Sequence, residues 1–404
     1  MTASLPQWLP AQLLHAYENA PAVRDILDAA SVRPQDITSP EDLARIPVTT
    51  KDSLLDLQRA NPPFGGFLAV APEDLRHVFV SPGPLFDPQG HDEIGLGFQR
   101  AFQAAGIGPG DIVLNTWSYH LVPAGLVMDE ALLAIGATVI PGGVGNSEQQ
   151  AQLIRQLGVT VVLASTAFFV ALAEKLTAMG HTLPGDWKVR LAFLGGEFGD
   201  WMSKRRGLEQ RYGLRTSSAY ATGDVGLIGY ECDAQEGYHV SDRHLVQVCH
   251  PTTGEPLEDG ERGEIVVTTS NRTYPLVRFG TGDVSYLMPP CSCGDPALRL
   301  APLQGRVGQA VKAKEIFIYP RQAEETGLRV PGVQRAQVVV TSNGSRDHVL
   351  LRLEVTDGDV PADFEEQAAE AFLALARMRP DAVDSGPAGH IPPDDPLVVD
   401  RRNP

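Results

Sequence analysis

The chain has 404 residues, of which 43% are apolar and 21% are charged; this composition is typical of globular proteins, not of disordered or fibrous ones. At roughly 150 residues per domain, the length predicts two to three domains. The 33 basic and 50 acidic residues give a net charge of −17, which argues against a nucleic-acid partner because the positive field needed for non-specific binding is missing. Only six of the basic residues are lysines: Lys51, Lys175, Lys188, Lys204, Lys312 and Lys314.

The start of the chain, MTASLPQWLP, lacks the basic stretch and apolar run of a secretory signal. No segment approaches the ~20 consecutive apolar residues of a membrane-spanning helix. Four cysteines are too few for a disulfide framework in a chain of this size. We therefore expect a cytoplasmic protein without a membrane partner.

Helical patterns dominate residues 1–75. Apolar residues recur at helical spacing in AQLLHAYENAPAVRDILDAA (11–30). Ser39, followed by Glu41 and Asp42, is typical of a helix start.

Strand and helix patterns alternate between residues 100 and 200, which predicts a parallel sheet of the α/β class. The run VTVVLAS (159–165) is almost wholly apolar, as expected of a strand buried on both faces. The other predicted strands are residues 110–117, 136–143 and 189–197, and the predicted helices are 147–158 and 166–180.

From residue 236 short strands and Thr-Gly or Asp-Gly turns predict an antiparallel sheet or a distorted barrel. A smaller α+β unit is predicted after Gly305, with strands at 338–343 and 348–355 and a helix at 362–378. The tail from Arg379 is rich in proline, aspartate and glycine, and we expect it to be extended.

Three of the four cysteines form a pattern with one histidine. Cys232 and His239 are separated by six residues, and Cys291 and Cys293 form a CxC in PPCSCG. Thiolate and imidazole ligands suit tetrahedral zinc, and four protein ligands make a closed, structural site. The alternative is that these are small buried apolar residues, but their polar, turn-rich surroundings favour zinc. Cys249, in the strand-like LVQVC, is predicted to lie in the core.

Several segments, in order along nearly the whole chain, resemble phenylacetate–CoA ligase and its relatives in the adenylate-forming superfamily. They include IPVTTKDSLLDLQRANPPFGG (46–66), IPGGVGNSEQQAQLI (140–154), FLGGE (193–197), YPLVRFGTGD (274–283) and GRVGQAVKAKEIFIYPRQAEE (305–325). The Cys/His set also resembles the zinc-ligand pattern of this family. The resemblance implies a large N-terminal domain with a β-rich subdomain (1–304), a small mobile α+β C-terminal domain (305–404), and a homodimer.

The resemblance also implies a reaction. Such enzymes form an acyl-adenylate from an aryl or acyl carboxylic acid and ATP with Mg²⁺. CoA, or a carrier protein, then attacks the adenylate to give a thioester.

A nucleotide site is implied residue by residue. Asp283 matches the aspartate that binds the ribose hydroxyls, and a carboxylate is the acceptor that two hydroxyl donors need. Arg278 and Arg306 match the arginines on either side of it, where a guanidinium suits phosphates. The other matched residues are Gly195, Gly196 and Glu197 beside the adenine, and Tyr220 and Asp224, of which Asp224 corresponds to a magnesium ligand. Alone, each would equally fit a surface ion pair or a glycine-rich turn.

The chain departs from the family where phosphates would bind. The stretch that corresponds to the phosphate loop is FVSPGPLFDPQG (79–90), in which Pro82 and Pro84 have no N–H to offer. Leu85 and Phe86 add bulk there. Gly308 replaces the hinge aspartate, and Glu315 replaces the glycine of the next hairpin.

The family's C-terminal lysine, which contacts the carboxylate and α-phosphate, aligns with Asp394, and no lysine follows Lys314. Losing this lysine and two loop donors would remove about 4–9 kcal/mol of transition-state stabilisation.

Three hypotheses follow from these features. The first is a carboxylate-activating ligase with a degenerate phosphate loop. The second is a repurposed relative that performs a condensation, cyclisation or acyl transfer without forming an adenylate; it would need its own acid–base groups, for which Tyr119 and His120 are the candidates, and His120 would be a general base. The alternative for His120 is a hydrogen-bonded structural residue. The third hypothesis is a catalytically inactive binding subunit.

Overall fold

The computed structural model describes residues 5–81, 85–91, 94–195, 201–308, 311–314, 316–343, 346–355, 361, 363–393 and 395–402. The contacts divide the chain into two compact units, one of Met1–Ser81 and Phe86–Gly305 and a second that contains Arg306–Pro404. Among the described residues, no helix is both long and apolar enough to cross a membrane.

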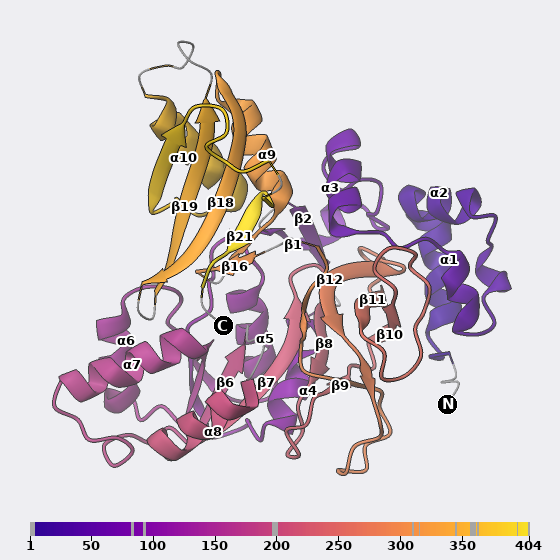
Figure 1. Cartoon of the computed structure of the whole chain (residues 1–404). Coiled ribbons are helices and arrows are strands. Elements are labelled where there is room, and N and C mark those ends of the chain that lie inside the picture. Colours follow the sequence, from indigo (N-terminus) through magenta and orange to yellow (C-terminus); the bar gives the residue numbers. More distant parts are fainter. Residues whose placement is uncertain are drawn as a thin grey trace. The chain divides into compact units, whose positions relative to one another are not determined.

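The N-terminal segment is helical, as predicted, with α1 (Leu9–Asn19), α2 (Pro21–Ala29) and α3 (Lys51–Ala60) (Figure 1). The pattern over residues 11–30 is divided at Ala20, whose backbone is extended, and Pro21 opens α2 at a position where a missing N–H is harmless. The helix predicted near Ser39 is a 3-10 helix, Glu41–Arg45, and further 3-10 turns span Pro34–Asp36, Pro72–Asp74 and Ile94–Gly97. Thr50 caps α3 by accepting the Ser53 N–H, which places Lys51 in the first turn.

The predicted parallel sheet is confirmed. Its strands lie in the order β4-β3-β5-β6-β7 and all neighbouring pairs are parallel. The strands are β3 (Ile112–Asn115), β4 (Thr138–Pro141), β5 (Val161–Ser165), β6 (Leu191–Gly195) and β7 (Arg215–Thr222). The helices of this region are α4 (Phe98–Ala104), α5 (Ala124–Ala134), α6 (Ser147–Gln156), α7 (Thr166–Ala178) and α8 (Trp201–Tyr212).

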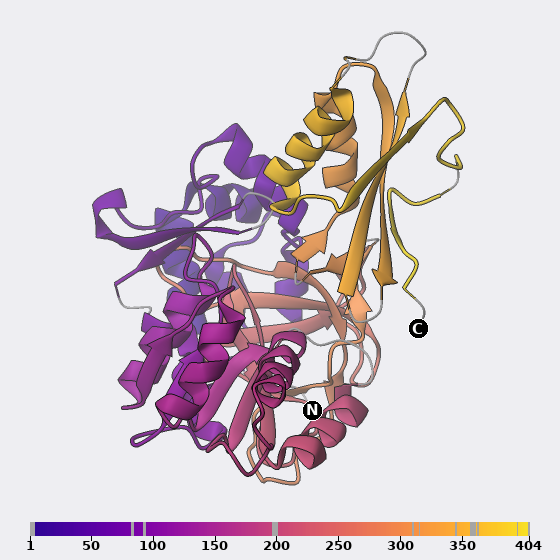
Figure 2. The same ribbon diagram turned by 90° about the vertical axis from the view of Figure 1, so that its left-hand side faces the viewer.

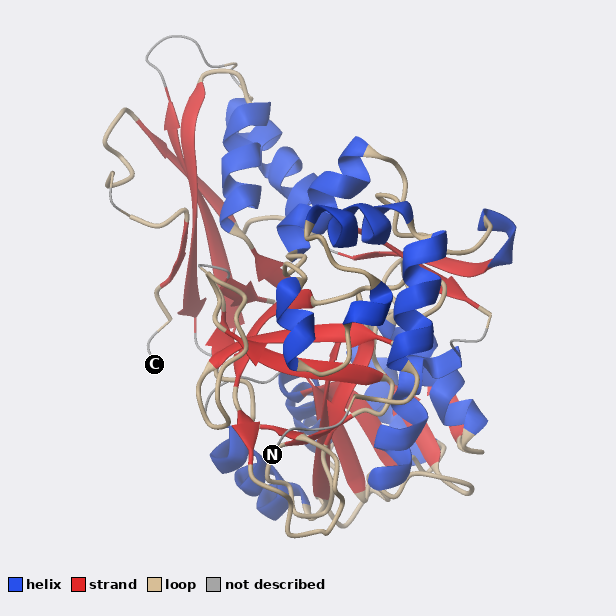
Figure 3. Cartoon of the chain, turned by 90° about the vertical axis from the view of Figure 1, so that its right-hand side faces the viewer, coloured by secondary structure: helices blue, strands red, loops and turns tan. Residues whose placement is uncertain are grey.

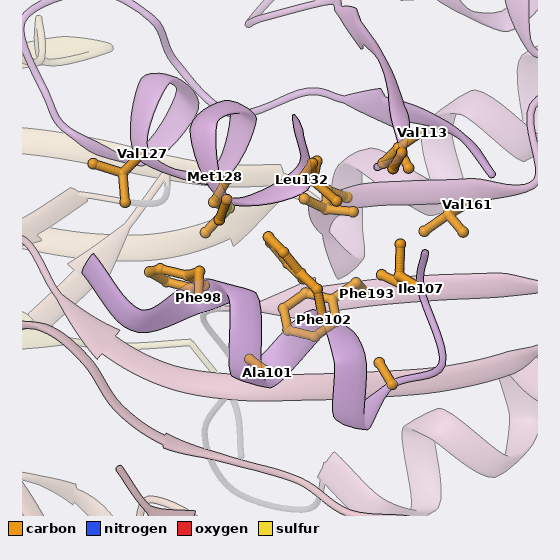
Figure 4. Close-up of a cluster of buried hydrophobic side chains, with 14 of the residues drawn as sticks. Phe98, Ala101, Phe102, Ile107, Val113, Val127, Met128, Leu132, Val161 and Phe193 are labelled. Carbon is orange, nitrogen blue, oxygen red and sulfur yellow. The ribbon is translucent and has the colours of Figure 1, made fainter. Parts of the chain in front are cut away.

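Alternate residues of these strands enter two different hydrophobic clusters, because successive side chains of a strand point to opposite faces. Val161 and Leu163 pack with residues of α4 and α5, among them Phe98, Phe102 and Leu132 (Figure 4). Val162 and Ala164 pack instead with residues of α6 and α7, among them Ile154, Phe169 and Leu172. Both faces are therefore covered, and helices lie against the strands in Figure 2. Burying each large apolar side chain contributes roughly 1.5–3 kcal/mol.

The β-rich region predicted after residue 236 is also confirmed. Four strands extend the parallel sheet in antiparallel fashion, in the order β7-β8-β9-β14-β13; they are β8 (Gly226–Tyr230), β9 (Tyr238–Val240), β13 (Leu287–Met288) and β14 (Arg299–Leu300). A separate antiparallel sheet contains β10 (His244–Cys249), β11 (Gly263–Thr269) and β12 (Phe279–Ser285), and β15 is Gly305–Arg306. Cys249 is fully buried, as predicted. The remaining pair is β1 (Leu75–Ser81) with β2 (Leu85–Gly90).

The second unit has an α+β fold with a sheet in the order β20-β19-β18-β21, in which β18 and β19 are antiparallel and the two outer strands run parallel to their neighbours. Helices α9 and α10 pack beside this sheet (Figure 3). Its elements are β16 (Val311–Ala313), β17 (Ile316–Ile318), α9 (Pro320–Arg329), β18 (Val333–Asn343), β19 (Arg346–Val355), α10 (Phe364–Ala376), β20 (Ala382–Gly386) and β21 (Val398–Asp400). The extended tail expected from Arg379 supplies β20 and β21.

A buried histidine makes the stability of the first unit depend on pH. Burial lowers the pKa of His244 to about 3, and the adjacent Arg243 lowers it further. An unfolded histidine titrates near 6.5, so between pH 6.5 and 3 the unfolded state binds a proton that the folded state does not, and stability falls as the pH falls. Between pH 7 and pH 4, we expect the free energy of unfolding of His244→Gln, measured by urea denaturation, to fall by less than that of the wild type. The difference should be on the order of 2–4 kcal/mol. Equal losses in both proteins would contradict this role.

Candidate functional site

The carboxyl ends of β3, β5, β6 and β7 meet at one edge of the parallel sheet, which is where ligands bind in open α/β folds. Trp117 follows β3, Thr166 follows β5 and Thr222 ends β7. The indole N–H of Trp117 and the hydroxyls of Thr166 and Thr222 are buried without a hydrogen-bond partner. Gly195 ends β6, where a Cβ would lie 3.2 Å from the Trp117 ring. Buried polar groups without partners at this edge point to a ligand site.

Tyr119 and His120, the predicted acid–base candidates, differ in their surroundings. The Tyr119 hydroxyl donates to Asp129 Oδ1 and accepts from Asn115 Nδ2, each at 2.9 Å. Burial and the Asp129 carboxylate raise the pKa of Tyr119 well above its usual value, so its phenol stays protonated at neutral pH. His120 is exposed, and its backbone N–H donates to Ser118 Oγ. The fold thus holds Tyr119 firmly, and it leaves the His120 ring in solvent.

The structure brings two of the predicted nucleotide-binding residues together. The Tyr220 hydroxyl, on β7, donates to Asp283 Oδ2, on β12, at 2.8 Å. Asp283 is 3% exposed and Tyr220 is 4% exposed. Because β7 and β12 belong to different sheets, this hydrogen bond joins the two β regions of the first unit. Gly196 and Glu197 lie outside the described residues.

Arg278 does not fit the phosphate contact that was expected of it. Its side chain is 1% exposed, and its guanidinium donates to the carbonyl oxygens of Leu43, Ala44 and Ile46 at 3.2, 3.1 and 2.6 Å. It also donates to the Gly254 carbonyl and to Cys249 Sγ. These acceptors come from two distant segments, so the residue cross-links them and is structural. A sequence match identifies an arginine, but it does not show which acceptors already take the hydrogen bonds of its guanidinium.

Arg306, the second matched arginine, lies in the second unit. Its guanidinium donates to the Tyr319 hydroxyl and its central carbon lies 5.6 Å from the centre of the Tyr319 ring. Tyr319 is the residue directly before α9. The contact therefore ties β15 to the start of α9.

Asp224, the magnesium candidate, lies beside two charged residues that sequence reasoning missed. Lys51 Nζ lies 3.0 Å from Asp224 Oδ2. Asp87, on β2, is 6% exposed. Burial and the Asp224 carboxylate raise the pKa of Asp87 well above its usual value, an effect that Lys51 and a hydrogen bond with the Ser81 side chain oppose. One signal was available in the sequence: an aspartate in a segment where the family places a phosphate loop.

The oxygen atoms near Asp224 fit a magnesium ion. Asp224 Oδ1 and Thr222 Oγ1 are buried without partners, and Mg²⁺ binds oxygen ligands, usually one or two carboxylates with other oxygens. In the altered phosphate loop, Leu85 is buried and Phe86 is 36% exposed. Pro82 and Pro84 lie outside the described residues.

The predicted zinc ligands gather in one place. The ligand atoms of Cys232, His239, Cys291 and Cys293 all lie within 4.8 Å of one another. Cys232 Sγ is 3.6 Å from Cys291 Sγ, and Cys293 Sγ is 3.4 Å from His239 Nε2. A tetrahedral zinc with bonds of about 2.1–2.3 Å separates its ligands by roughly 3.4–3.8 Å. These distances fit zinc and are too long for a disulfide.

The backbone around the cluster presents these four side chains. His239 lies on β9, which pairs with β8. Cys232 follows shortly after the end of β8. Cys291 and Cys293 lie on a turn closed by a hydrogen bond from the Gly294 N–H to the Cys291 carbonyl. Arg299, on β14, donates to the Pro289 carbonyl and steadies this turn.

The other departures from the family lie in the second unit. Gly308 has a φ of +79°, a left-handed conformation that is strained for an aspartate. Lys314 forms an ion pair with Asp381 at 2.6 Å. Glu315 and Asp394 lie outside the described residues.

Comparison with known proteins gives this site its family context. The chain is 32% identical over 358 residues to a protein named phenylacetate-coenzyme A ligase from Thermus thermophilus, across 85% of this chain and 79% of that protein. The chain belongs to the phenylacetate–CoA ligase family. A second member of the family, from Pseudomonas putida, is 30% identical over 357 residues, 85% of this chain and 79% of its own length. No protein-family model matches the chain.

A solved structure extends the family relationship to the fold. The crystal structure of 2-hydroxyisobutyryl-CoA ligase in complex with 2-HIB-AMP and CoA matches 98% of this chain and 88% of that chain. The TM-score is 0.89 at 22% sequence identity. This likeness confirms the predicted α/β fold class.

The cross-link made by Arg278 predicts a structural phenotype. Replacing Arg278 with alanine leaves the carbonyl oxygens of Leu43, Ala44 and Ile46 without their donor, and each buried group that is left unsatisfied costs about 1–3 kcal/mol. We expect Arg278→Ala to lower the free energy of unfolding by about 3 kcal/mol or more, measured by urea denaturation. A variant as stable as the wild type, but with weaker nucleotide binding, would restore the phosphate role.

Proposed function

We propose that this protein is a phenylacetate–CoA ligase-like enzyme that activates an aryl or acyl carboxylic acid with ATP and transfers the acyl group to a thiol, with CoA as the acceptor. The observation that carries the proposal is the Tyr220–Asp283 hydrogen bond next to the carboxyl ends of the parallel strands. Family membership supports the reaction class, and the names of the relatives support an acid and CoA as substrates.

In this proposal, the role of each residue follows from its position in the fold. Asp283 accepts hydrogen bonds from the ribose hydroxyls, and Tyr220 orients its carboxylate. Trp117 and Thr166 supply buried donors, which suit the carboxylate end of the acid or the polar part of its acyl group. Asp224 holds Mg²⁺, which neutralises phosphate charge when it is bound. Residues 305–404 act as a mobile domain, with Gly308 near the hinge.

A structural zinc ion belongs to the same proposal. Held by Cys232, His239, Cys291 and Cys293, it joins the β8–β9 hairpin to the turn after β13. All four positions are filled by protein, so this metal supports the fold and leaves no open position for a substrate.

One observation favours a second function. Asp87 is a buried carboxyl group in the segment that corresponds to the phosphate loop, and its ionised form would repel the phosphates of ATP. A relative that condenses, cyclises or transfers an already activated acyl group would not need that loop. The two functions differ in whether pyrophosphate is released.

The ligase proposal predicts acid-dependent release of pyrophosphate. Purified protein with saturating ATP and Mg²⁺ should release pyrophosphate when it is given a suitable member of a panel of aryl and acyl acids. Asp283→Asn should raise the KM for ATP about tenfold or more, because the loss of a charge-assisted hydrogen bond costs ~1.5–3 kcal/mol.

The matched control is Asp25→Asn, which changes an exposed carboxylate on α2 and should leave the KM for ATP unchanged. If no acid in a broad panel elicits pyrophosphate, the ligase proposal fails. Turnover of acyl thioesters in the same preparation would then support the second function.

The zinc proposal predicts about one equivalent of zinc in purified protein, measured by plasma emission spectrometry. Cys291→Ser should lose most of the metal and lower the melting temperature, because the binding energy of a structural metal contributes to folding. Cys249→Ser is the matched control, since Cys249 lies in the core away from the cluster, and it should retain the metal. Metal-free wild-type protein with an unchanged melting temperature would refute the site.

A further inference from the structure

The Cys/His cluster and the Tyr220–Asp283 pair lie on neighbouring strands. The sheet order is β7-β8-β9. Tyr220 lies on β7, Cys232 follows the end of β8, and His239 lies on β9. The strands that present two ligands of the cluster are therefore next to the strand that presents the tyrosine of the nucleotide site.

An aromatic side chain spans the distance between the two sites. Tyr238, directly before His239, is 5% exposed, and its ring centre lies 6.4 Å from that of Tyr220, a separation at which aromatic rings attract each other. The hydroxyls of Tyr238 and Ser218, on β7, are 3.2 Å apart. Gly229, the residue of β8 that pairs with Tyr220, has no side chain, and a Cβ there would lie 2.9 Å from Tyr238 Cβ. This glycine leaves the space through which Tyr238 crosses β8 and reaches Tyr220.

A buried ion pair makes a second connection to β7. Glu231, directly before Cys232, accepts two hydrogen bonds from the Arg205 guanidinium, each at 2.7 Å. Arg205 is fully buried and also donates to the hydroxyl of Thr216, on β7, at 2.9 Å. The Glu231 N–H donates to the Ser218 carbonyl at 3.1 Å. Because charge-assisted bonds of this kind fix geometry closely, the backbone at Cys232 is tied to β7.

The strand that carries Tyr238 has little support of its own. β9 is three residues long and pairs at two positions with β8 and at two with β14. A metal ion held by His239 together with Cys291 and Cys293 would join β9 to the turn after β13, and the binding free energy of such an ion contributes to folding. The position of Tyr238 therefore depends on the cluster.

We propose that Tyr238 is a positioning residue through which the zinc cluster keeps Tyr220, and with it Asp283, in the arrangement that binds the ribose of an adenine nucleotide. The inference rests on the proposed function, because it takes both the zinc ion and the ribose at Asp283 from there. It adds a coupling between the two sites. Since binding linkage is reciprocal, zinc and nucleotide each raise the affinity of the protein for the other by the same factor.

The test is binding of AMP to the full chain, measured by calorimetry with zinc-loaded protein and again after a chelator has removed the zinc. AMP has the ribose hydroxyls without the β- and γ-phosphates, so it reports on Asp283 independently of the altered phosphate loop. We expect removal of zinc to weaken AMP binding about tenfold. In a competition with the chelator, saturating AMP should raise the affinity for zinc by the same factor.

Variants that keep the zinc ligands provide a second readout, which decides the matter if the zinc-free protein unfolds. Tyr238→Leu should retain zinc and weaken AMP binding about fivefold or more. Tyr238→Phe keeps the ring beside Tyr220 and should bind AMP nearly as the wild type does. Tyr212→Leu is the matched control, because Tyr212 is an equally buried tyrosine in the separate cluster around Phe169, and it should leave AMP binding unchanged.

The outcomes separate the coupling from the ligase proposal. Equal AMP affinities with and without zinc, or a Tyr238→Leu variant that binds AMP like the wild type, would overturn the coupling and leave the ligase proposal standing. An equal loss of affinity in Tyr212→Leu would also overturn the role of Tyr238, since the effect would then come from lower stability. If zinc-loaded wild-type protein binds no AMP, the ribose site of the proposed function fails, and the coupling fails with it.

Discussion

Coverage of the central parallel strands on both faces is the constraint on which the rest of the first unit depends. Residues such as Val161 and Val162 face opposite hydrophobic clusters, so β5 and β6 are apolar along almost their whole length. In β5 the polar side chain, Ser165, stands at the end of the strand. Because neighbouring strands are parallel, their carboxyl ends meet at one edge, and Trp117, Thr166, Gly195 and Thr222 lie there.

Much of the fold could be predicted from local patterns. The run over 159–165 and the glycine-ended segment 189–197 correspond to β5 and β6 because burial on both faces leaves a continuous apolar stretch. The four zinc-ligand candidates could be predicted because cysteine and histidine in turn-rich segments are chemically distinctive. The split at Pro21 and the short 3-10 turn near Ser39 were missed, since both depend on one or two residues at helix ends.

The charges of the site could not be assigned in the same way. Lys51 and Asp224 are separated by 173 positions along the chain, and no periodic pattern connects them. Arg278 matched a family motif, yet both terminal nitrogens of its guanidinium donate to backbone carbonyls, from residues 43–46 and 254. An aligned residue type specifies which hydrogen bonds are available, whereas only the tertiary structure specifies which acceptors take them.

The Arg278 cross-link has a consequence for how the site can change. Directly after the carbonyls that it holds, Thr49 exchanges backbone hydrogen bonds with residues 278 and 280, and Lys51 follows two positions later. The position of the Lys51 ammonium group beside Asp224 therefore depends on the hydrogen bonds that attach residues 43–49 to the sheet of β10–β12. A substitution beneath residues 43–49 would displace a charge in the site without altering any side chain that lines it. Substitutions in the N-terminal segment can therefore change the electrostatics of the site during evolution while the residues that line it stay the same.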